Sequence, residues 1–185
     1  MRLLSTKSAA LTCGLFILSG GAVAEEKLSH GAAVFSKDTA IHVHLFDTSR
    51  ADLGKSKHAD IARSMANSAP HLLAADIVNA LREAGFTKVT LDESESGAVD
   101  DALQLTGRFT KLDPGSQNLR VWIGFGAGKS EVCISGKLST PEGNEVAEFD
   151  DCKSGLGWGQ SGPQGDKGAE VLGDRVAGRI IGLSD

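Results

Sequence analysis

Tyrosine is absent from this chain of 185 residues, and tryptophan occurs only twice. No segment of the sequence reaches the roughly 20 consecutive apolar residues that a membrane-spanning helix needs. Lysine and arginine form no dense cluster, and the 24 acidic residues outnumber the 19 basic ones. Affinity for nucleic acid requires clustered positive charge. The sequence therefore argues against a phenolic catalytic acid, a membrane span and a nucleic-acid partner.

Residues 1–24 have the layout of a secretory signal peptide. Two basic residues precede an apolar run at residues 9–18, and a triplet of small residues follows at residues 22–24. Signal peptidase cleaves after such a triplet. We therefore expect export to the periplasm and a mature chain of residues 25–185. Secretion beyond the envelope stays open.

The mature chain has the size of one domain. It contains 161 residues, from 25 to 185, which suffice for a single hydrophobic core. Arg2 and Lys7 leave with the signal peptide, so 17 basic and 24 acidic residues remain and the net charge is −7. Cys13 lies inside the apolar run and not at its end, which argues against lipid attachment.

Cys133 and Cys152 are the two cysteines of the mature chain. They lie in segments with strand character, residues 129–138 and 145–152, on either side of the turn residues 141–144. A hairpin centred in that turn places the two cysteines directly opposite each other. Disulfides form and persist in exported proteins. The sequence therefore predicts a disulfide between them, against the alternative of two separate buried thiols.

Hydrophobic periodicity predicts two helices and a sheet. Apolar residues recur at helical spacing from Ala69-Pro70 to Gly85 and again from Lys167 to Ile181, whereas the polar residues 48–60 indicate a loop. Strands are expected at residues 39–46, 88–91, 102–112, 119–123, 129–138 and 145–152. A β-α-β start followed by antiparallel strands favours an α/β (α+β) fold. We expect a mixed, mostly antiparallel sheet of about five strands with two main helices packed against it.

Residues 124–130 end in the Gly-Lys-Ser of a phosphate-binding loop. That loop needs four residues between its two glycines, whereas Gly124 and Gly128 enclose three. The residues that follow predict a strand, not the helix whose amide groups would hold the anion. The acidic residues from Asp92 to Asp101 lack the alternation and central glycine of a calcium loop. We therefore expect no nucleotide, calcium or other cofactor.

His42 and His44 are two residues apart in a predicted strand, so their side chains lie on the same face of it. Imidazoles at this spacing can share a metal ion. Val43 and Leu45 are the expected core residues, which places both histidines on the solvent-facing side. We expect an exposed pair, with a metal site at His42 and His44 as the alternative.

A family resemblance extends over most of the mature chain. The segments Leu105–Gly115, Gly124–Ser130 and 147–149 resemble the bacterial family called domain of unknown function 4410. The strand and helix between Ile41 and Gly85 also fit its layout. More distantly, the arrangement is similar to the curli-secretion-lipoprotein-like and TolB-N-terminal-like envelope domains. The resemblance implies an α/β fold and an exported location, and it brings no catalytic residues.

The chain has no nucleophile elbow, and we expect no free mature cysteine, so catalysis has no candidate residues. We expect a non-catalytic binding or accessory module of the cell envelope, whose partner is another envelope protein. Glycine-rich backbone admits the close approach of such a partner. The candidate partner surface comprises Gly124, Phe125, Gly126, Gly128 and Trp158. A metal-binding protein or metal-dependent hydrolase that uses the two histidines is the alternative, and a secreted effector is a third hypothesis.

Overall fold

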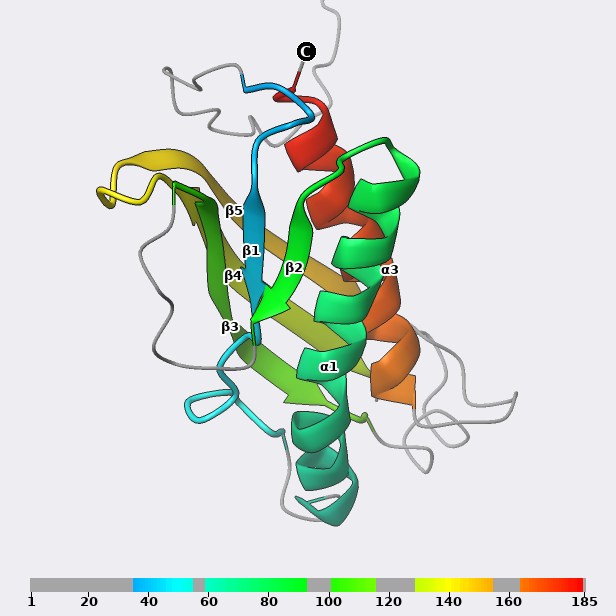
Figure 1. The fold of residues 1–185 in the computed structure, drawn as a ribbon. Helices are drawn as coiled ribbons and strands as arrows, with labels where there is room; N and C mark the ends of the chain where they lie inside the picture. The colour runs from blue at the N-terminus through cyan, green and yellow to red at the C-terminus, as the bar shows by residue number, and fades with distance from the viewer. Residues whose placement is uncertain (1–34, 55–58, 93–100, 116–128, 155–163, 185) are drawn as a thin grey trace, which may run out of the picture.

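The computed structural model describes residues 35–54, 59–92, 101–115, 129–154 and 164–184. These residues form two layers, a five-stranded sheet and two helices that lie together against one of its faces (Figure 1). The elements are β1 (Ile41–His44), α1 (Ala59–Glu83), β2 (Val89–Asp92), β3 (Leu103–Asp113), β4 (Glu131–Ser139), β5 (Glu145–Ser154) and α3 (Gln164–Ile181). The expected α+β architecture is confirmed, while the strand expected at residues 119–123 lies outside the described residues.

The strand order in the sheet is β2-β1-β3-β4-β5. β1 pairs in parallel with β2 and β3, and β3, β4 and β5 follow one another in antiparallel pairs. The parallel pair β1–β2 requires a crossover connection, which α1 supplies. Because β1 lies between two other strands and beneath the helices, Ile41 and Val43 are fully buried.

α1 begins at Ala59, so the predicted helix start at Ala69-Pro70 is wrong. The predicted loop at residues 48–60 also ends earlier than expected, because its last two residues belong to the helix. Pro70 lies inside the helix. Proline has no N–H to donate to the preceding turn, which weakens a helix at that point. Ala62 and Met65 are fully buried on the N-terminal side of the proline. Burial of these two side chains stabilises the part of the helix that precedes Pro70, although proline by itself favours the first turn of a helix.

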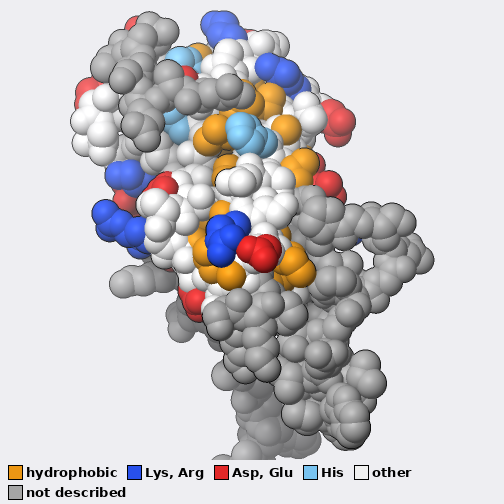
Figure 2. Space-filling model, turned by 90° about the horizontal axis from the view of Figure 1, so that it is seen from below, with side chains coloured by type: hydrophobic (Ala, Val, Ile, Leu, Met, Phe, Trp, Pro, Cys, Tyr) orange, Lys and Arg blue, Asp and Glu red, His pale blue; other side chains and the backbone are white. Residues whose placement is uncertain are grey.

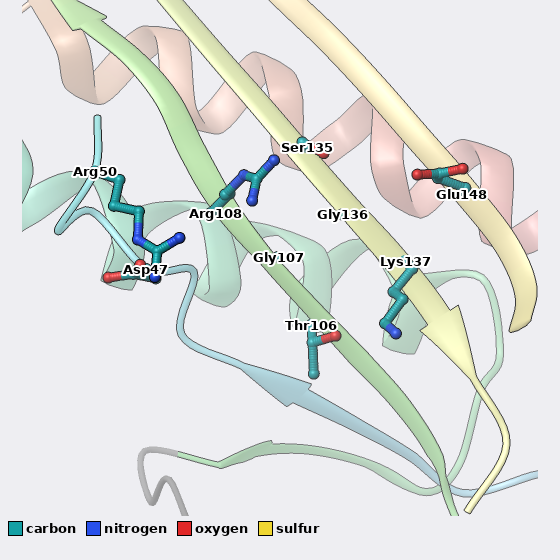
Figure 3. A pocket seen from close by; sticks show the side chains of 9 residues that line it. All are labelled: Asp47, Arg50, Thr106, Gly107, Arg108, Ser135, Gly136, Lys137 and Glu148. Atoms are coloured by element: carbon teal, nitrogen blue, oxygen red, sulfur yellow. The ribbon is translucent and has the colours of Figure 1, made fainter. Parts of the chain in front are cut away.

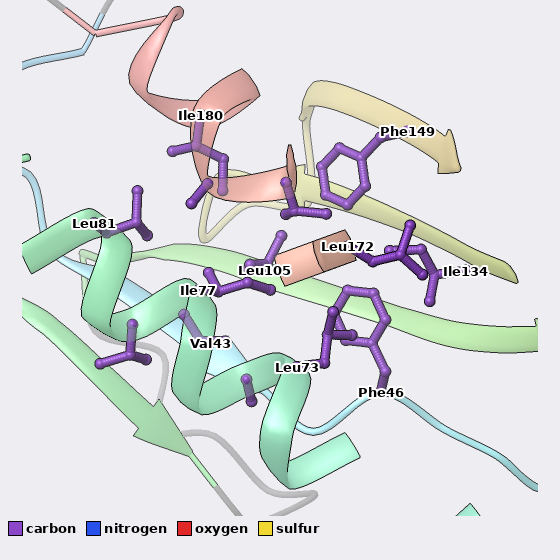
Figure 4. Close-up of a cluster of buried hydrophobic side chains, with 14 of the residues drawn as sticks. Val43, Phe46, Leu73, Ile77, Leu81, Leu105, Ile134, Phe149, Leu172 and Ile180 are labelled. Atoms are coloured by element: carbon purple, nitrogen blue, oxygen red, sulfur yellow. The ribbon is translucent and has the colours of Figure 1, made fainter. Parts of the chain in front are cut away.

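α1 and α3 contribute their apolar faces to one hydrophobic core between the helices and the sheet (Figure 4). Leu73, Ile77 and Leu81 recur along α1 at helical spacing, and Leu172 and Ile180 do so along α3. All five side chains are fully buried. The inner faces predicted from the periodicity of the sequence are therefore the faces that the helices bury.

Phe46 packs on the core side of the sheet over two glycines in neighbouring strands. Gly107 in β3 and Gly136 in β4 are register partners. A Cβ atom at Gly136 would lie 2.7 Å from the ring of Phe149 and 3.0 Å from that of Phe46, and one at Gly107 would overlap the Phe46 ring. The two glycines thus let the Phe46 ring lie directly on the backbone of the sheet.

Seen from below, the described surface has basic and acidic side chains close together, with hydrophobic and histidine side chains among them (Figure 2). The salt bridge between Arg63 and Asp60, one helical turn apart on α1, is an example of such exposed pairing. Within the described ranges, no helix combines the length and the hydropathy needed to cross a membrane.

Candidate functional site

A disulfide joins Cys133 in β4 to Cys152 in β5. The register of the two strands places these residues opposite each other, with their Cα atoms 4.1 Å apart. Nearer the turn the pairing shifts by one residue, between Leu138 and Ser139. Cys133 is buried and Cys152 is exposed. The predicted disulfide is therefore confirmed, and it ties the edge strand β5 to the rest of the sheet.

Glu131 lies beside this disulfide. In the described part of the chain, Glu131, Cys133 and Cys152 are the group of three potential metal ligands within 4.8 Å of one another. Both sulfur atoms are used by the disulfide, and Glu131 accepts a hydrogen bond of 2.6 Å from the Lys111 ammonium. That hydrogen bond raises the pKa of Lys111. The disulfide joins β4 to β5, and the Lys111–Glu131 hydrogen bond joins β3 to β4. Because the two sulfur atoms are bonded to each other, no thiolate is left to bind a metal ion.

His42 and His44 lie on the face of β1 opposite the buried Ile41 and Val43, as expected, and they are half-buried there and not fully exposed. β1 lies between β2 and β3, and residues of these two strands flank the two histidines. His44 Nε2 is 2.7 Å from Gln104 Oε1, which accepts its hydrogen bond. His42 Nδ1 is buried without a hydrogen-bond partner in the structure. Neither imidazole belongs to a group of three metal ligands among the described residues, and metal binding remains a hypothesis.

A shallow pocket opens on the face of the sheet that the two helices leave uncovered (Figure 3). Its volume is about 470 Å³. The paired glycines of β3 and β4 form part of its floor, and charged and hydroxyl side chains surround them. The lining consists of Asp47, Arg50, Thr106, Gly107, Arg108, Ser135, Gly136, Lys137 and Glu148.

Strand alternation explains why the side chains of this lining share one face. Successive residues of a strand point to opposite faces, and the sequence neighbours of Thr106 and Arg108 face the core. In the β3–β4 register, Thr106 lies opposite Lys137 and Arg108 lies opposite Ser135. In the β4–β5 register, Lys137 lies opposite Glu148. Three strands therefore combine to build a polar surface over the apolar core.

The segment that follows β1 supplies Asp47 and Arg50 at the rim of the pocket. Backbone hydrogen bonds join Asp47 to β3, so this segment continues alongside β3 beyond the end of β1. The Asp47 carboxylate accepts hydrogen bonds from the Ser49 amide at 2.8 Å and the Ser49 hydroxyl at 2.7 Å. These hydrogen bonds lower the pKa of Asp47, and the charges of Arg50 and Arg108 lower it further.

Among the described residues, Asp76 in α1 has the largest shift in pKa. It faces α3, where a Cβ atom at Gly173 would lie 2.6 Å from Asp76 Oδ2. Oδ2 is buried and has no hydrogen-bond partner in the structure. Burial, together with the negative charges of Asp174 and Glu170, raises the pKa of Asp76 to about 6. Because Asp76 lies between the helices and away from the pocket, its ionisation bears on helix packing.

The residues of the predicted partner surface, Gly124, Phe125, Gly126, Gly128 and Trp158, lie outside the described residues. That surface stays a prediction. Sequence reasoning missed the pocket residues Arg50, Arg108 and Lys137. A signal for two of them was present, because Arg108 and Lys137 occupy the solvent-facing positions of predicted strands.

Comparisons with known proteins identify related folds. The family model described as domain of unknown function (DUF4410) matches residues 34–159. A dodecameric PelC variant from Paraburkholderia phytofirmans has a TM-score of 0.51 at 16% identity, covering 84% of this chain and 96% of that chain. A DUF330 protein from Xanthomonas campestris has a TM-score of 0.47 at 10% identity, covering 78% of this chain and 84% of its own. None of the curated proteins matches this chain.

The similarity to the PelC variant shows a shared fold and, at 16% identity, no more than that. The family match is stronger, since it spans over half of the chain and includes β1 to β5. It also contains the segments whose residue pattern carries the resemblance in the sequence. The chain therefore belongs to the family described as domain of unknown function (DUF4410).

Proposed function

We propose that this chain is an exported, non-catalytic binding module of the cell envelope, and that its partner is another envelope protein. The main support for export is the disulfide between Cys133 and Cys152. Disulfides persist in oxidising compartments and are rare in cytosolic proteins. The signal-peptide pattern of residues 1–24 supports the same location.

The uncovered face of the sheet supports a binding role. Among the described residues, the helices cover the opposite face of the sheet, and the pocket opens on the face that they leave uncovered. Its pocket combines Arg50, Arg108 and Lys137 with hydroxyl side chains. Such groups recognise a partner through charge and directed hydrogen bonds, and arginine is enriched in protein interfaces.

Export is tested by fractionation of cells that produce the full chain. The expected product is a periplasmic protein whose intact mass corresponds to a start at Glu25 and whose two cysteines are oxidised. Retention of residues 1–24, acylation at Cys13, or free thiols at Cys133 and Cys152 in freshly isolated protein would each contradict the proposal.

The partner surface is tested with Trp158→Ala. An envelope protein that cross-links to the wild-type chain in cells should be lost from this variant, while the melting temperature stays unchanged, because the indole is proposed to contact the partner. Leu91→Ala is the control, since it removes an exposed hydrophobic side chain from β2 at the sheet edge. A Trp158→Ala protein that melts lower and keeps its partner would refute the surface.

Self-association is a separate question, because the similar PelC variant is a dodecamer. Sedimentation of the purified mature chain answers it. A monomer at micromolar concentration leaves a different protein as the partner. A discrete oligomer would make a second copy of the chain part of the binding unit.

Metal binding by His42 and His44 is the alternative function. The observation in its favour is the buried Nδ1 atom of His42, which has no hydrogen-bond partner in the structure. Metal analysis after incubation with Zn²⁺ and gel filtration tests it. Stoichiometric zinc that is lost in His42→Asn would support this alternative, and metal-free wild-type protein would rule it out.

A further inference from the structure

We infer that the pocket on the open sheet face binds a small anion, whose carboxylate or phosphate group is held by Arg50 and Arg108. Lys137 supplies a third positive charge to the same pocket. This assignment goes beyond an envelope-protein partner, because it gives the described residues of the pocket a ligand of defined chemistry.

The arginines of the described ranges fall into two groups. The four outside the pocket each have a partner: Arg63 with Asp60, Arg82 with the Val89 carbonyl, and Arg175 and Arg179 with Asp151. Arg50 and Arg108, the two in the pocket, have neither a hydrogen bond nor an ion pair in the structure, and the same holds for Lys137. Both arginines act on the Asp47 carboxylate through their charge alone, so the guanidinium groups of the described ranges that lack a direct contact are concentrated at this one place.

The two carboxylates of the pocket, Asp47 and Glu148, offset part of its positive charge. Each oxygen of Asp47 already accepts a hydrogen bond from Ser49. Glu148 lies opposite Lys137 in the sheet. Three positive and two negative side chains line the pocket, so their formal charges sum to +1. The pocket is therefore positive in a chain whose net charge is −5. An anion between Arg50 and Arg108 would reduce their mutual repulsion and gain attraction from both.

The arrangement of the side chains fits such an anion. In Figure 3, Arg108 points from β3 toward Ser135 on β4, and Lys137 points back toward Thr106. A guanidinium binds a carboxylate or phosphate through two parallel N–H groups, and the hydroxyl groups can add further hydrogen bonds. The volume of about 470 Å³ falls in the range of small-molecule sites, which are typically about 300–1,000 Å³.

Inorganic phosphate is the probe for this site, and backbone amide NMR shifts of the purified protein report its binding. We expect saturable shifts at the amides of Gly107, Arg108 and Lys137. Arg108→Gln should weaken phosphate binding by up to about fivefold, because an exposed charge pair contributes up to about 1 kcal/mol. Arg50→Gln should act in the same way, and it provides a second measure if Arg108→Gln perturbs the fold.

Arg63→Gln is the matched control, since it removes the same charge from the exposed surface of α1. Phosphate affinity should be unchanged in this variant. Shifts that do not saturate, or an equal loss of affinity in the Arg63 and Arg108 variants, would show that phosphate senses only the overall charge and would overturn the assignment.

The source of the anion is distinguished with two further probes. Glycerol phosphate that binds with the same dependence on Arg108, without retention on vesicles, identifies a soluble anion. Co-sedimentation with phosphatidylglycerol vesicles, and not with phosphatidylcholine vesicles, identifies a lipid headgroup if Arg108→Gln abolishes it. Vesicle retention that Arg108→Gln leaves unchanged would contradict the headgroup source. The Trp158→Ala test involves none of these residues, so the two proposals fail independently.

Discussion

Replacement of Asp76 by asparagine should stabilise the protein at neutral and alkaline pH. Asp76 lies between α1 and α3 with a buried oxygen that has no hydrogen-bond partner in the structure. Asp174 and Glu170 add negative charge around it. Asparagine has almost the same shape and no charge. The variant therefore removes the cost of a buried, repelled carboxylate and keeps the side chain beside Gly173.

The sign of the pH dependence follows from the raised pKa. The pKa of Asp76 is about 6 in the folded protein, against 3.8 for an ordinary aspartate. Below the lower value Asp76 is protonated in both states, so it costs no stability. As the pH rises from about 4 to 6, the unfolded chain loses the proton first, and the stability of the fold decreases. Above pH 6 the penalty is fully present.

The full shift corresponds to roughly 3 kcal/mol at 1.36 kcal/mol per pKa unit. Asp76 keeps some contact with water, which screens its interactions, so we expect a gain of about 1–2 kcal/mol for Asp76→Asn at pH 8. The gain should shrink toward pH 4.5, because the wild-type carboxyl is then protonated in the folded state.

Urea denaturation at pH 8, 6 and 4.5 measures this difference as a change of midpoint at constant slope. Asp174→Asn should produce a smaller gain at pH 8, since it removes one of the charges that act on Asp76. Glu145→Gln, which removes an exposed carboxylate from β5, is the control and should change stability by less than about 0.5 kcal/mol. A gain for Asp76→Asn that is equal at all three pH values, or a loss at pH 8, would refute the reasoning.

Further predictions concern the sheet. Cys152→Ser should lower the free energy of unfolding by about 2–4 kcal/mol under non-reducing conditions, and an unchanged urea midpoint would contradict a stabilising role for the disulfide. Gly107→Ala should cost about 1–3 kcal/mol because the methyl group overlaps the Phe46 ring. The second change Phe46→Leu should recover part of that loss in thermal melts, and strict additivity would argue against the overlap. Asp151→Asn, which removes the negative charge that forms ion pairs with Arg175 and Arg179, should cost about 1 kcal/mol in low salt and less in high salt.

Local patterns accounted for much of the fold. The register of the β4–β5 hairpin depends on one turn and on alternation within a short segment, so the pairing of Cys133 with Cys152 could be predicted from their distances to the turn. The inner faces of α1 and α3 follow from helical spacing in the same way. The start of α1 could not be predicted, since the burial of Ala62 and Met65 against the core outweighs the local preference of Pro70 for a first turn.

The candidate anion site depends on contacts that arise only when the chain is folded. Alternation along the sequence places Arg108 and Lys137 at polar positions of two strands, and the sequence also contains the Cys133–Cys152 spacing and the family pattern. It did not place Arg50, from the segment after β1, beside Arg108 on β3, nor Asp76 of α1 against Asp174 of α3. Pockets and shifted pKa values depend on distances between residues far apart in the chain, and these distances exist only once the sheet is ordered and the helices are packed.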